Sequence, residues 1–511
     1  MGDLNTGSLY TDFYQLTMAQ LYFSKGMHET TARFEHFFRN YPDYGEHQAG
    51  YCINAGLGTF IDWLEECQLT SRERKHLENQ TNAAGKDVFS EEFLDWLSKQ
   101  NPKERLTIES IPEGKVVHPN VPLTIVEGPL ALAQLVETPL LNMLNYQTLI
   151  ATKASRIRRA GESNLLLEFG MRRGHDRGAN AGARASLIGG ADFSSNTGQS
   201  YELGFPPKGT HAHSMVQAFI ARGDSELDAF RAFAEEFPDQ CILLVDTVDT
   251  IESGIPNAIT VFKELRQKGY EPVGIRLDSG DLAHLAVRAA RMLNDAGFED
   301  VSIVLSNQLD ERVLTQIVQQ IREEAPDYDL DPASVVNRLA YGVGTRLITS
   351  RGDASLGGVY KLVALKDDQW TPVLKISENP AKVPTPGRKQ CLRVYDSRKR
   401  ATVDVLAGID EEVTDSTDLT LHHPNKEQLQ RRLEASEISM VETLHETVLE
   451  QGDLHWVDDI QQMRDRREGD LDKLDPGVKR IMNPHRYHVS LTKNTWTQKQ
   501  ELMQKIHGAS G

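Results

Sequence analysis

The chain has 511 residues, of which 39% are hydrophobic and 7% aromatic, an ordinary composition for a globular protein of about three domains. Its net charge of −18 excludes a general nucleic-acid binder, because phosphate contacts need a basic surface, but it allows a local basic pocket for a small phosphorylated substrate. The four cysteines have no CxxC spacing, which favours free thiols in a reducing cytosol over a zinc site or a disulfide framework. There is no signal-peptide pattern and no apolar run of membrane-spanning length, so we expect a soluble, cytoplasmic protein.

The first segment, residues 1–135, mixes two kinds of pattern. Helical patterns cover 12–23 and 91–100, and strand-like patterns cover 31–38, 114–119 and 122–128. This flank does not look self-sufficient. We therefore expect it to be one part of a β-rich domain.

The middle segment, residues 136–354, alternates short apolar runs with helical patterns. The runs are 164–169, 241–246, 273–278, 301–307 and 339–345, and the helical patterns are 257–269, 281–298 and 310–325. Each helical pattern begins near a polar capping residue. The alternation predicts βα units around a parallel sheet, and the near-continuous apolar character fits strands buried on both faces. About five such units in roughly 200 residues fit an α/β barrel better than an isolated Rossmann domain, and no GxGxxG follows any of these runs.

The last two segments differ from each other. Residues 355–421 are rich in Pro, Gly and alternating patterns such as QCLRVYD (390–396) and TVDVLAG (402–408), which predict strands. We expect them to complete the β-rich α+β domain, with the barrel inserted between its two parts. Residues 422–511 are charged and are expected to be mostly helical, with REGDLDKLDPGVK (467–479) as a surface loop.

In α/β barrels the carboxyl ends of the strands carry the functional site. Here those positions are 168–173, 246–249, 276–281, 306–307 and 342–345. Arginine and glycine-rich backbone suit phosphate, and repeated aspartates suit Mg²⁺ or ribose hydroxyls. Single pieces have structural alternatives: Ser279 or Asp281 could cap a helix, and GVGT could be a tight turn. Their convergence on one edge favours a site for a phosphorylated sugar with a metal.

The stretch GTHAHSMVQAF (209–219) contains two histidines, His211 and His213. A metal pair would need a third ligand and a strand that places both side chains on one face. The helix-like residues that follow suggest that the two side chains diverge, and no HExxH pattern is nearby. One histidine that acts as a nucleophile or proton carrier is therefore favoured, with a structural histidine as the alternative.

Several of these motifs, in this order and over nearly the whole chain, resemble the nicotinate phosphoribosyltransferase family. They are LYTDFYQLTMAQLYF (9–23), LLEFGMRRGHDRGANAGARASLIGGADFSSN (166–196), GTHAHSMVQAF, GIRLDSGDL (274–282), YGVGTRL (341–347) and NPHRYHVSL (483–491). The resemblance implies the type II phosphoribosyltransferase fold, an irregular, incomplete TIM-like α/β barrel with a β-rich domain built from both flanks. It also implies a homodimer with shared active sites.

The resemblance further implies the reaction. Nicotinate and 5-phosphoribosyl 1-pyrophosphate (PRPP) give nicotinate mononucleotide and pyrophosphate in NAD biosynthesis. ATP, as co-substrate, is hydrolysed to ADP and phosphate through a transient phosphohistidine, and Mg²⁺ is the cofactor. No GxxxxGK[ST] is present in the sequence, so ATP would not be held by a P-loop.

Individual residues take roles from the same resemblance. His213 would be phosphorylated, and Asp278 would stabilise the positive charge that develops at the ribose. Nicotinate would be bound by Phe169, Thr210, Arg276, Asp192 and Tyr14, the last from the second subunit. PRPP would be bound by Arg172, Asp246, Asp278, Gly344, Thr345 and Lys361, with Asp246 and Asp278 as Mg²⁺ ligands.

Three alternatives remain open. Nicotinamide phosphoribosyltransferase shares the fold and several motifs, and assays with nicotinate and nicotinamide would separate the two. A catalytically silent, oligomeric scaffold of the same fold would not bind PRPP. A barrel metalloenzyme that uses His211 and His213 would contain bound metal.

Overall fold

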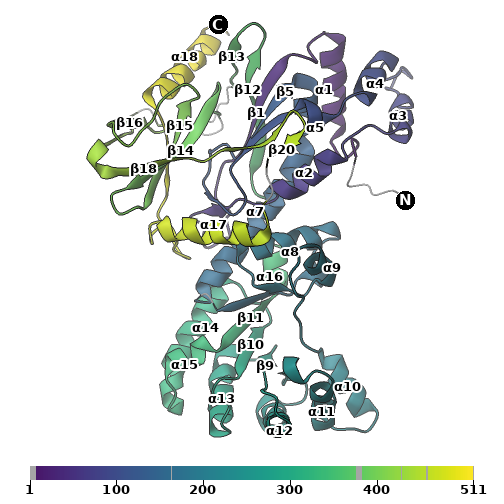
Figure 1. The fold of residues 1–511 in the computed structure, drawn as a ribbon, viewed down its shortest axis with the longest axis vertical. Helices are drawn as coiled ribbons and strands as arrows, with labels where there is room; N and C mark the ends of the chain where they lie inside the picture. The colour runs from purple at the N-terminus through teal and green to yellow at the C-terminus, as the bar shows by residue number, and fades with distance from the viewer. Residues whose placement is uncertain (1–6, 163, 376–382, 427, 456–457, 510–511) are drawn as a thin grey trace. The chain divides into compact units, whose positions relative to one another are not determined.

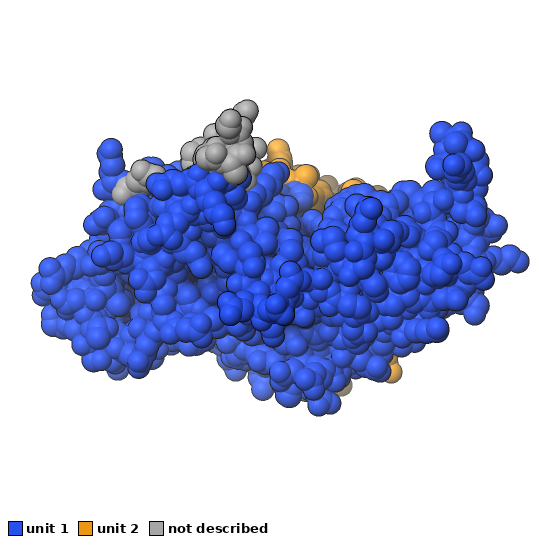
Figure 2. All heavy atoms as spheres, turned by 90° about the horizontal axis from the view of Figure 1, so that it is seen from above, with its two compact units in different colours: residues 1–152, 355–511 blue, residues 153–354 orange. Residues whose placement is uncertain are grey.

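A computed structural model describes residues 7–162, 164–375, 383–426, 428–455 and 458–509. The chain, drawn as a ribbon in Figure 1, divides into two compact units, which have different colours in Figure 2. Unit 1 consists of residues 1–152 and 355–511, and unit 2 of residues 153–354. Both flanks therefore contribute to unit 1, and the chain passes into unit 2 within helix α7 (Glu137–Ala160), later than the boundary expected at residue 136.

Unit 2 is built on a parallel sheet in which every strand except the short one at Phe193–Ser194 follows a predicted apolar run. Its spatial order is β7 (Phe193–Ser194), β6 (Leu165–Glu168), β11 (Leu339–Val343), β10 (Ser302–Ser306), β9 (Gly274–Leu277) and β8 (Ile242–Leu244). Every neighbouring pair is parallel. Their carboxyl ends therefore meet at one edge, as the sequence predicts.

Helices connect these strands. They are α8 (Arg177–Gly189), α9 (Thr197–Glu202), α10 (His213–Ala221), α11 (Glu226–Glu236), α12 (Ile255–Gln267), α13 (Leu282–Asp295), α14 (Glu311–Glu324), α15 (Pro332–Asn337) and α16 (Thr345–Ile348). Asp281 and Asp310 cap two of them where the sequence places polar caps. The helix expected from Asn257 instead begins at Ile255, after Gly254, with no side-chain cap. Asp281 is the N-cap of α13, because its carboxylate accepts the backbone N–H groups of Ala283 and His284. Asp249, expected at the site edge, instead caps the short turn η3 (Thr250–Gly254).

Of the predicted α/β barrel, the structure confirms a mixed α/β fold with a parallel sheet. In the described residues β7 and β8 lie at the two edges of this sheet, and no ladder joins them. The specific description as an incomplete barrel therefore stays a prediction.

Unit 1 contains a mixed set of sheets to which both flanks contribute. The first has the order β13 (Trp370–Pro372), β12 (Gly358–Lys366), β1 (Thr31–Phe38), β5 (Thr124–Pro129), β3 (Thr107–Ser110), β19 (Glu446–Glu450) and β20 (Asp453–Leu454). The second has the order β17 (Gln430–Leu433), β16 (Leu419–His422), β21 (His488–Leu491), β15 (Ala401–Gly408), β14 (Lys389–Asp396) and β18 (Ile438–Thr443), and a short pair joins β2 (Cys52–Ile53) to β4 (Val116–Val117). Since β1 pairs with both β5 and β12, the two flanks form one structure.

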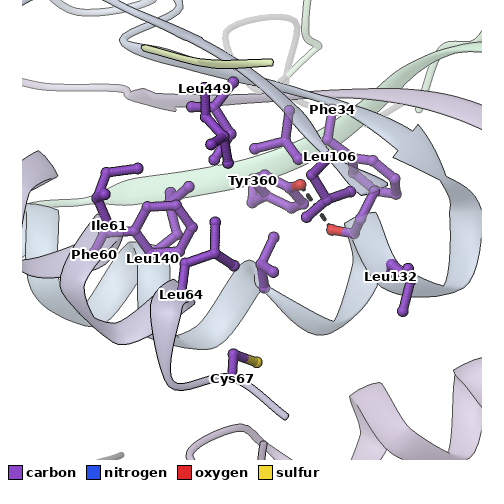
Figure 3. Packing of buried hydrophobic residues seen from close by; sticks show 14 of the residues in the cluster. Phe34, Phe60, Ile61, Leu64, Cys67, Leu106, Leu132, Leu140, Tyr360 and Leu449 are labelled. Atoms are coloured by element: carbon purple, nitrogen blue, oxygen red, sulfur yellow. Dashed lines mark hydrogen bonds between the residues drawn. The ribbon is translucent and has the colours of Figure 1, made fainter. Parts of the chain in front are cut away.

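Unit 1 also contains the helices α1 (Phe13–Ser24), α2 (Leu57–Glu65), α3 (Ser71–Glu78), α4 (Glu91–Ser98), α5 (Pro102–Arg105), α6 (Leu130–Leu135), α17 (Ile460–Lys473) and α18 (Lys493–Ala509). Residues of α2, α6 and α7 form a buried apolar cluster with residues of the first sheet. Figure 3 shows this cluster, in which Phe34 stacks on Tyr360 with ring centroids 4.8 Å apart. The Tyr360 hydroxyl donates to the carbonyl of Ala133 at 2.7 Å, so its one polar atom is satisfied inside the core. Among the described residues, no helix has the length and apolarity needed to cross a membrane.

The expectation of a mostly helical region at 422–511 is wrong. This region contains α17 and α18 but also strands β17 to β21, which pair with strands from both flanks. The expected surface loop at 467–479 lies largely within α17, where Arg467 and Asp470 are buried. Asp470 is buried because it completes an ion-pair network with Arg393 on β14, at 3.1 Å. The charged residues of this segment predicted exposure to solvent, but ion pairing allows Asp470 to be buried.

Candidate functional site

Arg276, at the end of β9, is the centre of a polar cluster at the carboxyl edge of the parallel sheet. Its Nε donates to Ser306 Oγ at 2.8 Å, Nη1 donates to Thr210 Oγ1 at 2.9 Å, and Nη2 donates to Asp278 Oδ1 at 3.1 Å. Its guanidinium carbon lies 5.5 Å from the centroid of the Phe169 ring. The structure thus brings together Phe169, Thr210, Arg276 and Asp278, which the sequence assigned to one site. A planar cation beside an aromatic ring suits a flat anionic ligand.

Phe169 is held in place by the residues around the end of β6. The preceding Glu168 is fully buried; its carboxylate accepts the Ser194 hydroxyl at 2.6 Å and the backbone N–H of Gly170. Burial raises the pKa of Glu168, against the lowering effect of these two hydrogen bonds. On β11, Gly342 leaves the space that the Phe169 ring fills. Sequence analysis placed Glu168 at this edge without a specific role and did not single out Ser194.

Replacing Gly342 with Ala is expected to displace the Phe169 ring. A Cβ at position 342 would come within 2.5 Å of the ring. We expect a loss of about 1–3 kcal/mol in the free energy of unfolding, as in other overpacked cores, together with weaker binding of an aromatic ligand. Denaturant unfolding and ligand titration would measure both. The control is Gly357→Ala, because a Cβ there meets nothing within 4 Å; equal losses in both variants would contradict the steric explanation.

Asp246 and Asp278 form the acidic part of the site. The Asp246 side chain is only 2% exposed. Its Oδ2 accepts the backbone N–H of Asp278 at 3.1 Å and the Ser279 hydroxyl at 2.5 Å. Its Oδ1 is buried without a hydrogen-bond partner among the described residues. A buried carboxylate oxygen left in this state indicates a missing cationic or hydrogen-bonding ligand.

His213, the first residue of α10, lies beside these two carboxylates. Its Nδ1 is 3.0 Å from the Thr247 hydroxyl oxygen, and its Nε2 is 3.9 Å from both Asp246 Oδ1 and Asp278 Oδ2. The side chain is 39% exposed, so a ligand can reach it. Thr247 is a contact that the sequence did not assign, although it lies on the predicted edge.

His211 has different surroundings from His213. Its Nε2 accepts the backbone N–H of Leu244 at 3.0 Å, and its Nδ1 lies 3.4 Å from the carbonyl oxygen of Ala212. Burial lowers the pKa of His211 to about 4, so the ring is neutral at pH 7. Because β8 is an edge strand, the imidazole takes the place of a neighbouring strand for this N–H. With Nε2 committed in this way, His211 and His213 do not form a metal pair.

Other predicted site residues are placed as follows. Arg172 is exposed in the turn η1 (Met171–Arg173), Gly344 is half-buried before α16, and Thr345 is the exposed first residue of α16. Asp192 lies near the amino end of β6, where it pairs with Arg158 at 2.7 Å and accepts the backbone N–H of Leu166. This position does not favour the base-pocket role expected for Asp192, which stays a prediction.

Tyr14 and Lys361 belong to unit 1. Tyr14 lies on α1 and is 49% exposed, while Lys361 lies on β12, where burial lowers its pKa. Their expected roles toward nicotinate and PRPP also stay predictions.

Two carboxylates of the site suit a magnesium ion. No group of three or more His, Cys, Asp or Glu side chains that could hold a metal is present in the described part of the chain. Mg²⁺ does not require such a cage, because it keeps several waters and is held by one or two carboxylates plus substrate phosphates. Asp246, with its unpartnered Oδ1, and Asp278 fit that mode of binding.

The fold and this site define an α/β enzyme with an arginine, a histidine and paired aspartates at the carboxyl edge of a parallel sheet, arranged for an anionic substrate. Family profiles described as the nicotinate phosphoribosyltransferase (NAPRTase) N-terminal and C-terminal domains match residues 9–145 and 388–499. Nicotinate phosphoribosyltransferase of Bacillus subtilis (strain 168) is 39% identical over 507 residues, which cover 98% of this chain and 95% of that protein. The human protein of the same name is 32% identical, with 95% and 94% covered. The chain belongs to the nicotinate phosphoribosyltransferase family.

A solved structure supports the same assignment. The crystal structure of human nicotinic acid phosphoribosyltransferase is similar with a TM-score of 0.78 and 29% identity, and the match covers 96% of this chain and 99% of that one. The likeness therefore includes the parallel-sheet unit, which lies outside the two matched family profiles.

Proposed function

We propose that this protein is an ATP-coupled nicotinate phosphoribosyltransferase that acts in NAD biosynthesis. The observation that carries the proposal is the Arg276 guanidinium, held beside the Phe169 ring and within hydrogen-bond distance of Asp278. Nicotinate is a flat ring with a carboxylate, and this arrangement offers it a face and a planar cation. A carboxamide would bring no negative charge to Arg276, which favours nicotinate over nicotinamide.

The proposed transfer step uses positioning and charge. Phe169, with Tyr14 of a second subunit, holds the pyridine ring so that its nitrogen attacks C1 of PRPP, and the bond from C1 to the pyrophosphate oxygen breaks. Asp278 stabilises the positive charge that develops on the ribose. Arg172, Gly344, Thr345 and Lys361 bind the phosphates in this scheme. Mg²⁺ bound to Asp246 and Asp278 would neutralise charge on the pyrophosphate.

The proposed coupling step uses His213. One imidazole nitrogen takes the γ-phosphoryl group of ATP and ADP leaves; later, water cleaves the phosphorus–nitrogen bond and phosphate leaves. A phosphoryl group on His213 would add negative charge beside Asp246 and Asp278. This added charge strengthens the binding of PRPP together with Mg²⁺, and the equilibrium of the reaction shifts toward nicotinate mononucleotide.

The cellular setting belongs to the same proposal. The four cysteines are free thiols and buried, which suits a reducing cytoplasm. The exposed Phe13 and Tyr14 on α1 suit a homodimer in which Tyr14 completes the partner's site.

The test is product formation by the purified full chain. We expect nicotinate mononucleotide and pyrophosphate from nicotinate and PRPP, with ATP raising the yield and being converted to ADP. Nicotinamide in place of nicotinate should give far less product. If no product forms from nicotinate, both in the presence and in the absence of ATP, the proposed activity is refuted. A PRPP titration would then test the alternative of a catalytically silent scaffold.

A further inference from the structure

Ser306 is the last residue of β10 and lies between Arg276 of β9 and Asp278, the residue that follows β9. The strands are parallel, with Val304 opposite Arg276 and Leu305 opposite Leu277, so Ser306 comes next to Asp278. The residue is 3% exposed. Its hydroxyl accepts Arg276 Nε at 2.8 Å and donates to Asp278 Oδ1 at 2.5 Å. A single hydroxyl thus bridges the cation and the carboxylate of the site.

The direction of these two hydrogen bonds is fixed. Arginine is a donor only, so the serine oxygen must accept from Nε. The one hydroxyl proton is then directed to Asp278, the shorter of its two acceptor contacts, since the carbonyl of Leu277 is 3.3 Å away. Ser306 therefore holds Arg276 from one side and occupies a lone pair of Asp278 from the other.

A hydrogen bond at Nε determines the orientation of the guanidinium plane. This nitrogen joins the planar group to the aliphatic stem, so a partner at Nε restricts rotation of the whole group. Of its five N–H groups, three have partners among the described residues: Ser306, Thr210 and Asp278. The two N–H groups left over lie on the terminal nitrogens, where a substrate carboxylate can accept them as a pair.

We infer that Ser306 is a positioning residue that determines the preference for a pyridine carboxylate over the corresponding carboxamide. This inference rests on the proposed function. Two parallel hydrogen bonds to a carboxylate need a fixed plane, whereas a carboxamide offers one acceptor oxygen and tolerates a rotated guanidinium. Without the Ser306 hydroxyl, Nε also loses its partner in a buried place, and the guanidinium is free to rotate about its remaining contacts with Thr210 and Asp278. The negative charge of Asp278 then competes with that of the substrate.

The test compares the full-length enzyme with Ser306→Ala, Ser306→Thr and Ser306→Cys. The readout is the ratio of kcat/KM for nicotinate to that for nicotinamide, with KM and kcat determined separately. In Ser306→Ala we expect the KM for nicotinate to rise and this ratio to fall by about tenfold, the scale of one hydrogen bond to a charged group. Ser306→Thr keeps the hydroxyl and should restore the ratio, while the weakly bonding thiol of Ser306→Cys should give an intermediate value.

The matched control is Ser302→Ala, the same change at the amino end of the same strand. It should leave the ratio and both kinetic constants unchanged. A merely structural role for Ser306 would lower the stability of the variants and leave the ratio as it is in the wild type; that result overturns the inference. If Ser306→Ala does not fold, Ser306→Cys decides, because a wild-type ratio in that variant also overturns it. If the wild-type enzyme forms no product from nicotinate, the proposed function has failed rather than the role of Ser306 alone.

Discussion

Replacing Arg276 with Ala is expected to reduce kcat/KM for nicotinate by about 100-fold, because several charged hydrogen bonds are lost at once. The guanidinium side chain is 12% exposed and is the cation placed beside both the Phe169 ring and Asp278. Its removal takes away the proposed partner of the substrate carboxylate and leaves Asp278 with its charge less compensated. Steady-state kinetics with saturating PRPP and varied nicotinate would measure the change.

Two comparisons sharpen the Arg276 prediction. Arg276→Lys keeps the charge but not the planar pair of donors, so it should recover only part of the loss. Arg231→Ala removes an exposed arginine of α11, paired with Glu264 at 2.7 Å, and should leave nicotinate kinetics unaltered. A nicotinate KM and kcat in Arg276→Ala equal to those of the wild type would place the carboxylate site elsewhere.

The sequence predicted the strands of unit 2 well because their pattern is local. Runs such as 301–307 are apolar throughout, since a central parallel strand is buried on both faces, and β10 lies within that run. The same reasoning placed Arg276 and Ser306 on one edge. It could not find β7, because a strand of two residues, Phe193–Ser194, leaves no periodic signal.

The parts that the sequence missed depend on contacts between distant residues. Arg276 and Thr210 are 66 positions apart, and nothing local to either one predicts their hydrogen bond. Asp470 looks like a solvent-exposed acid until the packing of α17 against β4 brings it next to Arg393. His211 is similar: its role as an acceptor for Leu244 becomes visible only when β8 is known to be the edge strand.

The identity of the chemically active histidine gives the second large effect. His213→Ala is expected to abolish the stimulation by ATP while leaving a basal, ATP-independent transfer, because Phe169, Arg276 and Asp278 stay in place. The imidazole of His213 is the one directed at both carboxylates, at 3.9 Å from each. Product yield with and without ATP, together with ADP release, would show the loss of coupling.

The control for His213 follows from the contacts of its neighbour. His211→Gln places an amide oxygen where Nε2 accepts the backbone N–H of Leu244, so the segment 209–213 should keep its place and the enzyme its coupling. Incubation with ATP labelled in the γ-phosphoryl group adds a direct measurement. The wild type and His211→Gln should carry an acid-labile label and His213→Ala none, as expected for a phosphorus–nitrogen bond on a single imidazole. If the label or the ATP stimulation persists in His213→Ala, another residue carries the coupling. Loss of both in His211→Gln alone would assign the coupling to His211. The burial of His211 and its neutral ring, which is hydrogen-bonded to the backbone, argue against that outcome.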